Sequence, residues 1–214
     1  MPANTHKGIF SNRGPVVRLD RNRKASMIEV FLQEALQNRV SGYHILDIGC
    51  GNGMISEHFA SENEVVGVDV NDQRKTTNSN FHFQHVSSAK LPFDDDSFDI
   101  ALSHHVIEHI PDQETHLLEM HRILRTNGIG YLGTPNRNSP IMEGHVGNDL
   151  VLRYQEMKPL FERCGFNVEL LSVRLAANPD RYFGEVRFGR FLPSFVLRFL
   201  LPIFPSQYFL LRKT

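Results

Sequence analysis

The chain has 214 residues, of which 41% are hydrophobic, and a formal net charge of −1 at pH 7. This length and apolar content favour a single globular domain with a sizeable core. A charge so close to zero excludes the whole-chain attraction that draws basic proteins to nucleic acid, so we expect no nucleic-acid partner. The two cysteines, Cys50 and Cys164, lie far apart and outside any metal-ligand spacing. That pattern fits a reducing, cytoplasmic location.

Residues 1–24 are aperiodic and rich in Gly, Asn and Arg, so we expect a loose N-terminal arm or lid. Simple terminal disorder is the alternative. The segment holds no apolar stretch of the kind that a signal peptide needs. Residues 25–36 place apolar side chains at helical spacing and predict an amphipathic helix. The domain therefore begins at about residue 25 and, by this interpretation, runs to residue 214.

Short apolar runs predict strands near 44–48, 65–69, 81–86, 98–103 and 128–133, followed by weaker strands at 166–173 and 208–211. Helical stretches separate the first five. Alternating strands and helices predict an α/β fold with a mostly parallel sheet covered by helices on both faces. Ligands of such sheets bind at the carboxyl ends of the strands. Asp47, Asp69 and His104 all fall at such ends, which predicts one shared site.

A glycine-rich loop follows the first expected strand directly. The strand ends in Asp47, and Gly49, Gly51 and Gly53 come next in a G-x-G-x-G pattern. A dinucleotide-binding loop would instead need a third glycine at the position of Met54. The second strand ends in Asp69, an acid placed to accept hydrogen bonds from ribose hydroxyls. These residues predict a nucleoside-binding unit that does not take NAD.

This loop and its preceding acid resemble motif I of the class I S-adenosylmethionine (SAM)-dependent methyltransferases. Residues 91–100 resemble the family's LPF…SFD segment, and residues 104–112 resemble its motif after the fourth strand. Residues 122–128 resemble its R-x-L-x-x-G-G turn, with Asn127 in place of one glycine. The resemblance covers roughly residues 40–175 and is closest to the small-molecule branch, which includes the ubiquinone-biosynthesis O-methyltransferases.

The resemblance implies a Rossmann-like sheet of seven strands and SAM as the cofactor. Asp47 would orient the loop or reach the cofactor's ammonium through water, and Asp69 would hold the ribose, with a helix N-cap as its alternative role. The family usually has an acid near the adenine amine, where this chain has Ser87. The full set of implied cofactor-binding residues is Asp47, Gly49, Cys50, Gly51, Gly53, Asp69, Val70, Ser87, Ser88, Ala89 and His104.

Three histidines, His104, His105 and His109, follow the fourth expected strand. A base assists methyl transfer when the acceptor is a hydroxyl, and histidine suits that task because its pKa lies near neutrality. His105, Glu108 and His109 have the spacing that would put them on one helix face. We predict His105 or His109 as the base or as an acceptor-orienting residue. Packing or helix capping is the alternative.

The same residues spell H-x-x-E-H, an inverted zinc-protease signature. A zinc hydrolase would need these residues on a long helix, whereas Pro111 interrupts the segment soon after a strand. Some quinone-pathway O-methyltransferases resemble a metal-assisted variant, but His105 stands where an acid is usual, and Mg²⁺ prefers oxygen ligands. We therefore predict no metal site.

Residues 174–207 separate the last two strands and read as an insertion. Within it, residues 186–207 are apolar, aromatic and basic, and three prolines and Arg198 make a membrane-spanning helix unfavourable. Roofing an apolar acceptor pocket, lying on a membrane surface and forming a homodimer contact all fit this composition. Altogether, the sequence predicts SAM-dependent methyl transfer to a small molecule, with oxygen as the target atom. A non-catalytic SAM-binding sensor or accessory protein is the second hypothesis.

Overall fold

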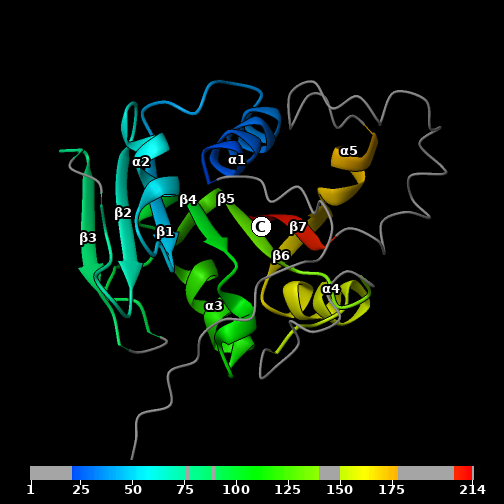
Figure 1. Ribbon diagram of the computed structural model, residues 1–214. Coiled ribbons are helices and arrows are strands. Elements are labelled where there is room, and N and C mark those ends of the chain that lie inside the picture. Colours follow the sequence, from blue (N-terminus) through cyan, green and yellow to red (C-terminus); the bar gives the residue numbers. More distant parts are fainter. Residues whose placement is uncertain (1–20, 76–77, 88–89, 140–149, 178–204, 214) are drawn as a thin grey trace, which may run out of the picture.

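The computed structural model describes residues 21–75, 78–87, 90–139, 150–177 and 205–213 (Figure 1). Strands and helices alternate through most of this part of the chain. The elements, in chain order, are α1 Arg21–Leu36, β1 His44–Ile48, α2 Met54–Ala60, β2 Glu64–Asp69, β3 Phe81–His85, β4 Phe98–His104, the 3₁₀ turn η1 Ile107–His109, α3 Gln113–Ile123, β5 Leu124–Pro135, α4 Tyr154–Arg163, β6 Phe166–Leu170, α5 Ser172–Ala177 and β7 Ser206–Lys213.

The seven strands form one sheet in the order β3-β2-β1-β4-β5-β7-β6. Neighbours from β3 to β5 pair in parallel, and β7 runs antiparallel to both β5 and β6. This is the seven-stranded, mostly parallel sheet that the sequence predicted. The connections turn in opposite directions on either side of β1 and β4, so a ligand crevice is expected at the carboxyl ends of these two strands.

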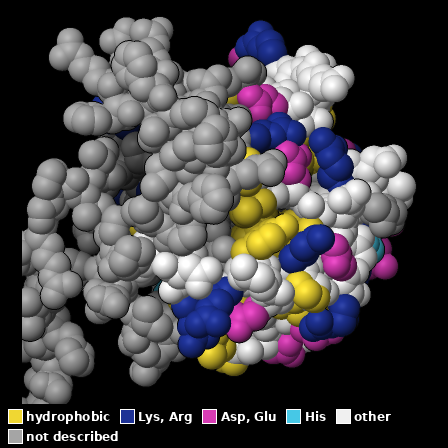
Figure 2. All heavy atoms as spheres, turned by 90° about the vertical axis from the view of Figure 1, so that its right-hand side faces the viewer, with side chains coloured by type: hydrophobic (Ala, Val, Ile, Leu, Met, Phe, Trp, Pro, Cys, Tyr) yellow, Lys and Arg dark blue, Asp and Glu magenta, His cyan; other side chains and the backbone are white. Residues whose placement is uncertain are grey.

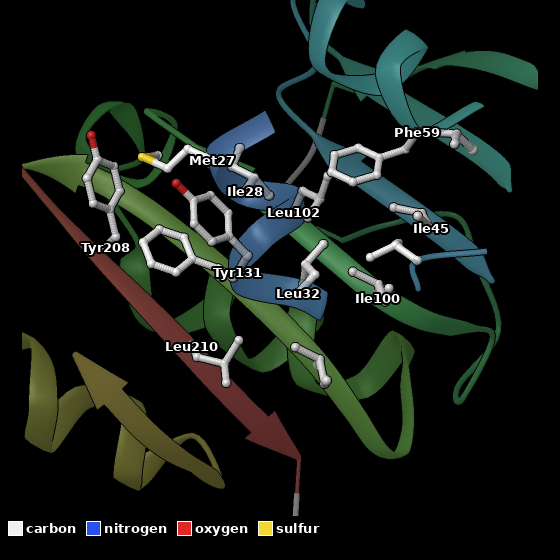
Figure 3. Packing of buried hydrophobic residues seen from close by; sticks show 14 of the residues in the cluster. Met27, Ile28, Leu32, Ile45, Phe59, Ile100, Leu102, Tyr131, Tyr208 and Leu210 are labelled. Atoms are coloured by element: carbon white, nitrogen blue, oxygen red, sulfur yellow. The ribbon is translucent and has the colours of Figure 1, made fainter. Parts of the chain in front are cut away.

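Helices cover both faces of the sheet (Figure 1). On one face α1 and α2 pack on the strands, and the apolar residues of α1 that the periodicity singled out are fully buried there, including Met27, Ile28 and Leu32 (Figure 3). On the other face Leu117 of α3 and Phe161 of α4 belong to a second buried cluster. Because helices and apolar side chains cover both faces of the sheet, we look for polar side chains at the ends of the strands.

The junction between α3 and β5 explains a departure from the family pattern. Phe98 of β4 pairs with Leu124 and Ile100 pairs with Ile129, so β5 carries extra residues at its start. Asn127 lies within this irregularity with φ 64°, the left-handed conformation that asparagine tolerates better than most residues. A Cβ at Gly128 would lie 2.7 Å from the carbonyl oxygen of Arg125, so glycine is required there. Asn127 thus keeps the backbone shape that the family's glycine provides.

Parts of two predicted segments lie outside the described residues. Of the expected N-terminal arm, residues 1–24, only residues 21–24 are described, and they form the start of α1. The expected insertion at 174–207 begins inside α5 and ends inside β7, and residues 178–204 between them are not described. The structure therefore does not test the expected role of residues 186–207.

Charged side chains of both signs are interspersed on the described part of the face shown in Figure 2, with apolar side chains between them. Several charged side chains of the described residues are paired across neighbouring elements, as in the contact of 3.2 Å between Arg174 of α5 and Glu34 of α1. No helix in the described part of the chain is long and apolar enough to span a membrane.

Candidate active site

The loop after β1 has an unusual backbone. Gly49, Gly51 and Gly53 have φ angles of 70°, 55° and 78°, a region that residues with a Cβ rarely adopt. The amide of Gly49 donates to the carbonyl of Val68 in β2 over 2.7 Å, so the loop is held against the neighbouring strand. The Cys50 amide donates to the same carbonyl over 3.1 Å.

Two of these glycines have different surroundings. A Cβ at Gly49 would collide with the side chain of Val106, which follows β4. A Cβ at Gly51, in contrast, would meet no protein atom within 4 Å. Gly49 is therefore required by the packing of the protein itself, whereas the left-handed backbone at Gly51 borders open space. That difference is expected where a ligand approaches the backbone closely.

Asp47 lies beneath the loop and is 2% exposed. Its Oδ2 accepts a hydrogen bond of 2.5 Å from the Ser56 hydroxyl, which ties the end of β1 to α2. Burial raises the pKa of Asp47 to about 7, the hydrogen bond from Ser56 lowers it, and the nearby Asp69 raises it further. Burial likewise raises the pKa of the Cys50 thiol, which makes that thiol unreactive.

Asp69, the last residue of β2, faces the glycine loop. Its Oδ2 accepts from the amide of Gly51 over 2.9 Å, and its Oδ1 accepts from the amide of Asn71 over 3.0 Å. Val70 follows with a side chain that is 61% exposed, an unusual position for a large apolar residue. Ser87 is exposed just past β3, while Ser88 and Ala89 lie outside the described residues.

The segment after β4 is not the helix that the spacing suggested. His105 has φ 58°, and only Ile107–His109 form a single 3₁₀ turn. The prediction that His105, Glu108 and His109 share one helix face was therefore wrong, because the left-handed residue reverses the chain before the turn begins. The long helix of a zinc hydrolase is absent here, and no group of three or more His, Cys, Asp or Glu among the described residues is placed to hold a metal.

The structure nevertheless pairs two of these residues. Nδ1 of His105 lies 3.0 Å from Oε1 of Glu108, and Oε2 of Glu108 accepts from the Thr134 hydroxyl over 3.2 Å. Glu108 is only 2% exposed, so this carboxylate is buried with its partners. Nε2 of His105 lies 3.5 Å from the hydroxyl oxygen of Ser206. The side chain of His109 is exposed.

His104 turns towards aromatic rings. Its Nδ1 lies 3.2 Å from the hydroxyl oxygen of Tyr131, and its ring is nearly parallel to those of Tyr131 and Tyr208, with interplanar angles of 18° and 7°. Figure 3 shows the two tyrosines side by side on β5 and β7, on the α1 side of the sheet. Burial lowers the pKa of His104 well below its usual value, with smaller contributions from His105 and Lys24.

Sequence reasoning missed Ser206, Tyr208, Tyr131 and Thr134. Each belongs to β5 or β7, and they reach the site because Pro135 pairs with Ser206 and Gly133 with Tyr208 in the antiparallel ladder. The available signal was the chain direction: β7 begins at the edge of the sheet where β4 and β5 end. Without the register, that signal could not say which residues of the last strand face the site.

The profile of a family described as "Methyltransferase domain" matches residues 46–132, the segment from β1 into β5. Residues 46–132 thus match a methyltransferase domain, and the chain resembles SAM-dependent methyltransferases. A probable S-adenosylmethionine-dependent methyltransferase of Mycolicibacterium smegmatis is 30% identical over 148 residues, covering 64% of this chain and 56% of the relative. A ubiquinone biosynthesis O-methyltransferase of Ruegeria pomeroyi is 29% identical, covering 53% of this chain and 50% of the relative.

The chain thus spans about half the length of these methyltransferase relatives. Among solved structures, the cyclase SpnF superposes with a TM-score of 0.61 at 19% identity, covering 99% of this chain and 88% of that one. At that identity the likeness extends to the fold alone. The family resemblance inferred from the sequence is confirmed, and the fold by itself does not decide the reaction.

Proposed function

We propose that the chain binds SAM above the glycine loop and transfers its methyl group to the hydroxyl of a small-molecule acceptor. One observation carries the cofactor half of this proposal. The left-handed backbone of Gly51 borders open space at a crevice-forming strand end, and its amide is hydrogen-bonded to Asp69. A loop held this way presents bare backbone beside a carboxylate, which suits a ligand that brings ribose hydroxyls close to main chain.

The residues of the crevice fit SAM. Asp69 uses one lone pair of each oxygen on a backbone amide, so each oxygen keeps capacity to accept from a ribose hydroxyl. The exposed side chain of Val70 supplies an apolar surface for a nucleobase beside that carboxylate. Asp47 is occupied by Ser56, which supports its loop-orienting role. When bound, SAM supplies a methyl group that its sulfonium already activates.

His105 is the better candidate for the base. If Glu108 accepts the Nδ1 proton of His105, Nε2 keeps a lone pair, which faces the Ser206 hydroxyl at the edge of the site. A proton taken up at Nε2 would give an imidazolium beside a buried carboxylate, and that opposite charge stabilises it. Thr134 holds the other carboxylate oxygen in place. The side chain of His109 is exposed, and we place the base at His105.

The relatives support the acceptor class in outline. The Ruegeria relative is named as an O-methyltransferase of ubiquinone biosynthesis, which is why we place oxygen and a small molecule first. The free, buried Cys50 and Cys164 are consistent with the cytoplasmic location that the composition suggested. A homodimer and a lipid contact through residues 186–207 stay predictions.

The second hypothesis is a SAM-binding protein that transfers no methyl group. The chain shares its fold with a protein named as a cyclase, and one fold can serve different reactions. We therefore keep this second hypothesis. The pairing of the partly exposed His105 with the buried carboxylate of Glu108 supports a catalytic role, because it orients the imidazole as a carboxylate orients a catalytic base.

Two measurements test the proposal. Calorimetry should show binding of SAM and of its product S-adenosylhomocysteine (SAH), and none of NAD. Incubation with methyl-labelled SAM and a panel of small hydroxyl compounds should then yield a labelled product. Binding of NAD without SAH would contradict the cofactor assignment. Binding of SAH without transfer to any member of the panel would favour the sensor hypothesis.

A further inference from the structure

His104 occupies a place that the sheet provides for it. In the register of the sheet, His104 of β4 lies opposite Gly133 of β5, and Gly133 lies opposite Tyr208 of β7. A Cβ at Gly133 would stand 2.7 Å from Nδ1 of His104 and 3.0 Å from the Tyr131 hydroxyl. The absence of a side chain at Gly133 therefore lets the imidazole and the Tyr208 ring approach each other across the strand, with centroids 6.3 Å apart.

One nitrogen of this imidazole is unsatisfied. Nε2 of His104 is closed off from solvent and has no hydrogen-bond partner among the residues that the structure describes. Leaving a buried donor or acceptor unpaired is unfavourable, so such groups in native proteins are rare and call for a reason. A ligand atom that reaches Nε2 would remove this cost.

The direction of the hydrogen bond between Tyr131 and His104 decides the tautomer of the imidazole. Burial raises the pKa of Tyr131, so its phenol keeps its proton, and the described partner for that O–H is Nδ1 of His104 at 3.2 Å. If Tyr131 donates to Nδ1, the neutral imidazole carries its own proton on Nε2. The unpaired atom is then an N–H donor without an acceptor among the described residues.

We propose that Nε2–H of His104 donates a hydrogen bond to the hydroxyl oxygen of an uncharged methyl acceptor. This inference rests on the proposed function and adds to it the group that binds the acceptor. His104 ends β4 beside β1, and Val106 packs over Gly49, so the acceptor side adjoins the glycine loop. The His105 ring meets that of His104 edge-on, with centroids 4.6 Å apart. His104 thus positions the oxygen, and the next residue takes its proton.

The charge state of the acceptor follows from burial. A charged group brought to Nε2 would lose its hydration where the surrounding rings, Tyr131 and Tyr208, are neutral. A hydroxyl group loses much less hydration free energy on burial, and its oxygen can accept the hydrogen bond from Nε2–H. His105 and Lys24 of α1 also lower the pKa of His104, as positive charges nearby do, so an anion is the serious competitor.

The test uses three probes of one size and different charge: benzyl alcohol, benzylamine and benzoate. The protein is labelled with ¹⁵N-histidine, and each probe is titrated with and without SAH. We expect His104 to be neutral with its proton on Nε2, and benzyl alcohol alone to shift that resonance. Because SAH binding is measured separately, its failure would contradict the proposed function while leaving the His104 result readable.

Three variants separate hydrogen bonding from structure. His104→Phe keeps a flat ring but removes both nitrogens, and it should weaken benzyl alcohol binding roughly three- to tenfold, as expected for one hydrogen bond. His104→Gln places an amide near the position of Nε2 and should restore part of the loss. Tyr131→Phe removes only the bond to Nδ1, so it should bind benzyl alcohol more tightly than His104→Phe does.

Several results would overturn the inference. They are tighter binding of benzoate or benzylamine than of benzyl alcohol, an Nε2 resonance that no probe moves, or equal binding by wild type and His104→Phe. His44→Phe serves as the control, because His44 lies exposed at the opposite end of the sheet and pairs with Glu64. It should leave probe binding unchanged, and a loss of binding equal to that of His104→Phe would also count against the inference.

Discussion

Replacing single glycines by alanine should separate the ligand's contribution from the protein's own packing. Gly42, Gly49 and Gly51 all have positive φ, at 78°, 70° and 55°. An added Cβ would meet nothing within 4 Å at Gly42 or at Gly51, but would collide with Val106 at Gly49. Only Gly51 combines open space with a place in the candidate cofactor crevice. All three variants therefore carry the same kind of backbone strain. Gly49→Ala adds a collision with Val106, and Gly51→Ala adds a Cβ in the candidate cofactor crevice.

The expected magnitudes follow from these surroundings. A left-handed alanine costs roughly 1–2 kcal/mol, and the stiffer unfolded chain offsets about 0.4–1 kcal/mol of it. Gly42→Ala and Gly51→Ala should each lower the free energy of unfolding by about 1 kcal/mol, or roughly 2–4 °C in Tm for a chain of this size. Gly49→Ala adds an overpacking cost of about 1–3 kcal/mol, so its Tm should fall further, by roughly 4–15 °C.

Thermal unfolding without ligand and calorimetry with SAH together measure these effects. Gly42→Ala should bind SAH as wild type does, whereas Gly51→Ala should lose at least about tenfold in affinity, or roughly 1.4 kcal/mol. The reasoning would be refuted by a Gly51→Ala variant that binds SAH normally. It would also be refuted if Gly51→Ala were far less stable than Gly42→Ala, because the space at Gly51 would then be filled by protein.

Four further outcomes are expected. Asp69→Ala should weaken SAH binding by about 1.5–3 kcal/mol in calorimetry, since it removes a charged acceptor, and unchanged affinity would contradict the ribose role. His105→Ala and Glu108→Gln should keep SAH affinity but lose roughly 10²–10⁴-fold in methyl transfer measured with labelled SAM; full turnover in both would leave positioning alone as the mechanism. Because the pKa of Asp47 is raised from 3.8 to about 7, the folded state holds a proton that the unfolded state has released. The free energy of unfolding of the wild type, relative to that of Asp47→Asn, should thus decrease by up to roughly 4 kcal/mol as the pH rises from 3.8 to about 7, and then stay constant. Urea titrations measure this difference, and a difference that stays flat between about pH 4 and pH 8 would disprove the shift. If residues 186–207 contact lipid, the protein should sediment with anionic liposomes at low salt and be released by salt; a protein that stays in the supernatant would reject that reading.

Local chemistry made most of the fold predictable. Most of the parallel strands are short apolar runs beside a turn, and an acid followed by glycines at the end of β1 is typical of nucleoside binding. The cofactor side of the site therefore followed from adjacent residues, as the hydrogen bond between Gly51 and Asp69 illustrates.

The acceptor side could not be read in the same way. His105 has the spacing of a helical residue, yet its left-handed φ depends on a backbone bond of 2.7 Å to the Gly133 carbonyl, a partner far away in the chain. Tyr208 and Ser206 enter through the register of β7, which the pattern of one strand does not determine. Side chains brought together by pairing between distant strands leave little trace in local sequence.

The position of β7 in the sheet has a consequence for the order of assembly. Within the described sheet β6 pairs only with β7, and β7 follows β6 in the chain but lies between it and β5. β7, which joins β6 to the rest of the sheet, thus follows β6 in the chain. The insertion of β7 between β5 and β6 has to close a long loop. We expect β6 amides to exchange with solvent at least as fast as those of β7, because any opening that frees β7 also releases β6. The stack of the His104, Tyr131 and Tyr208 rings should therefore also form only when β7 inserts.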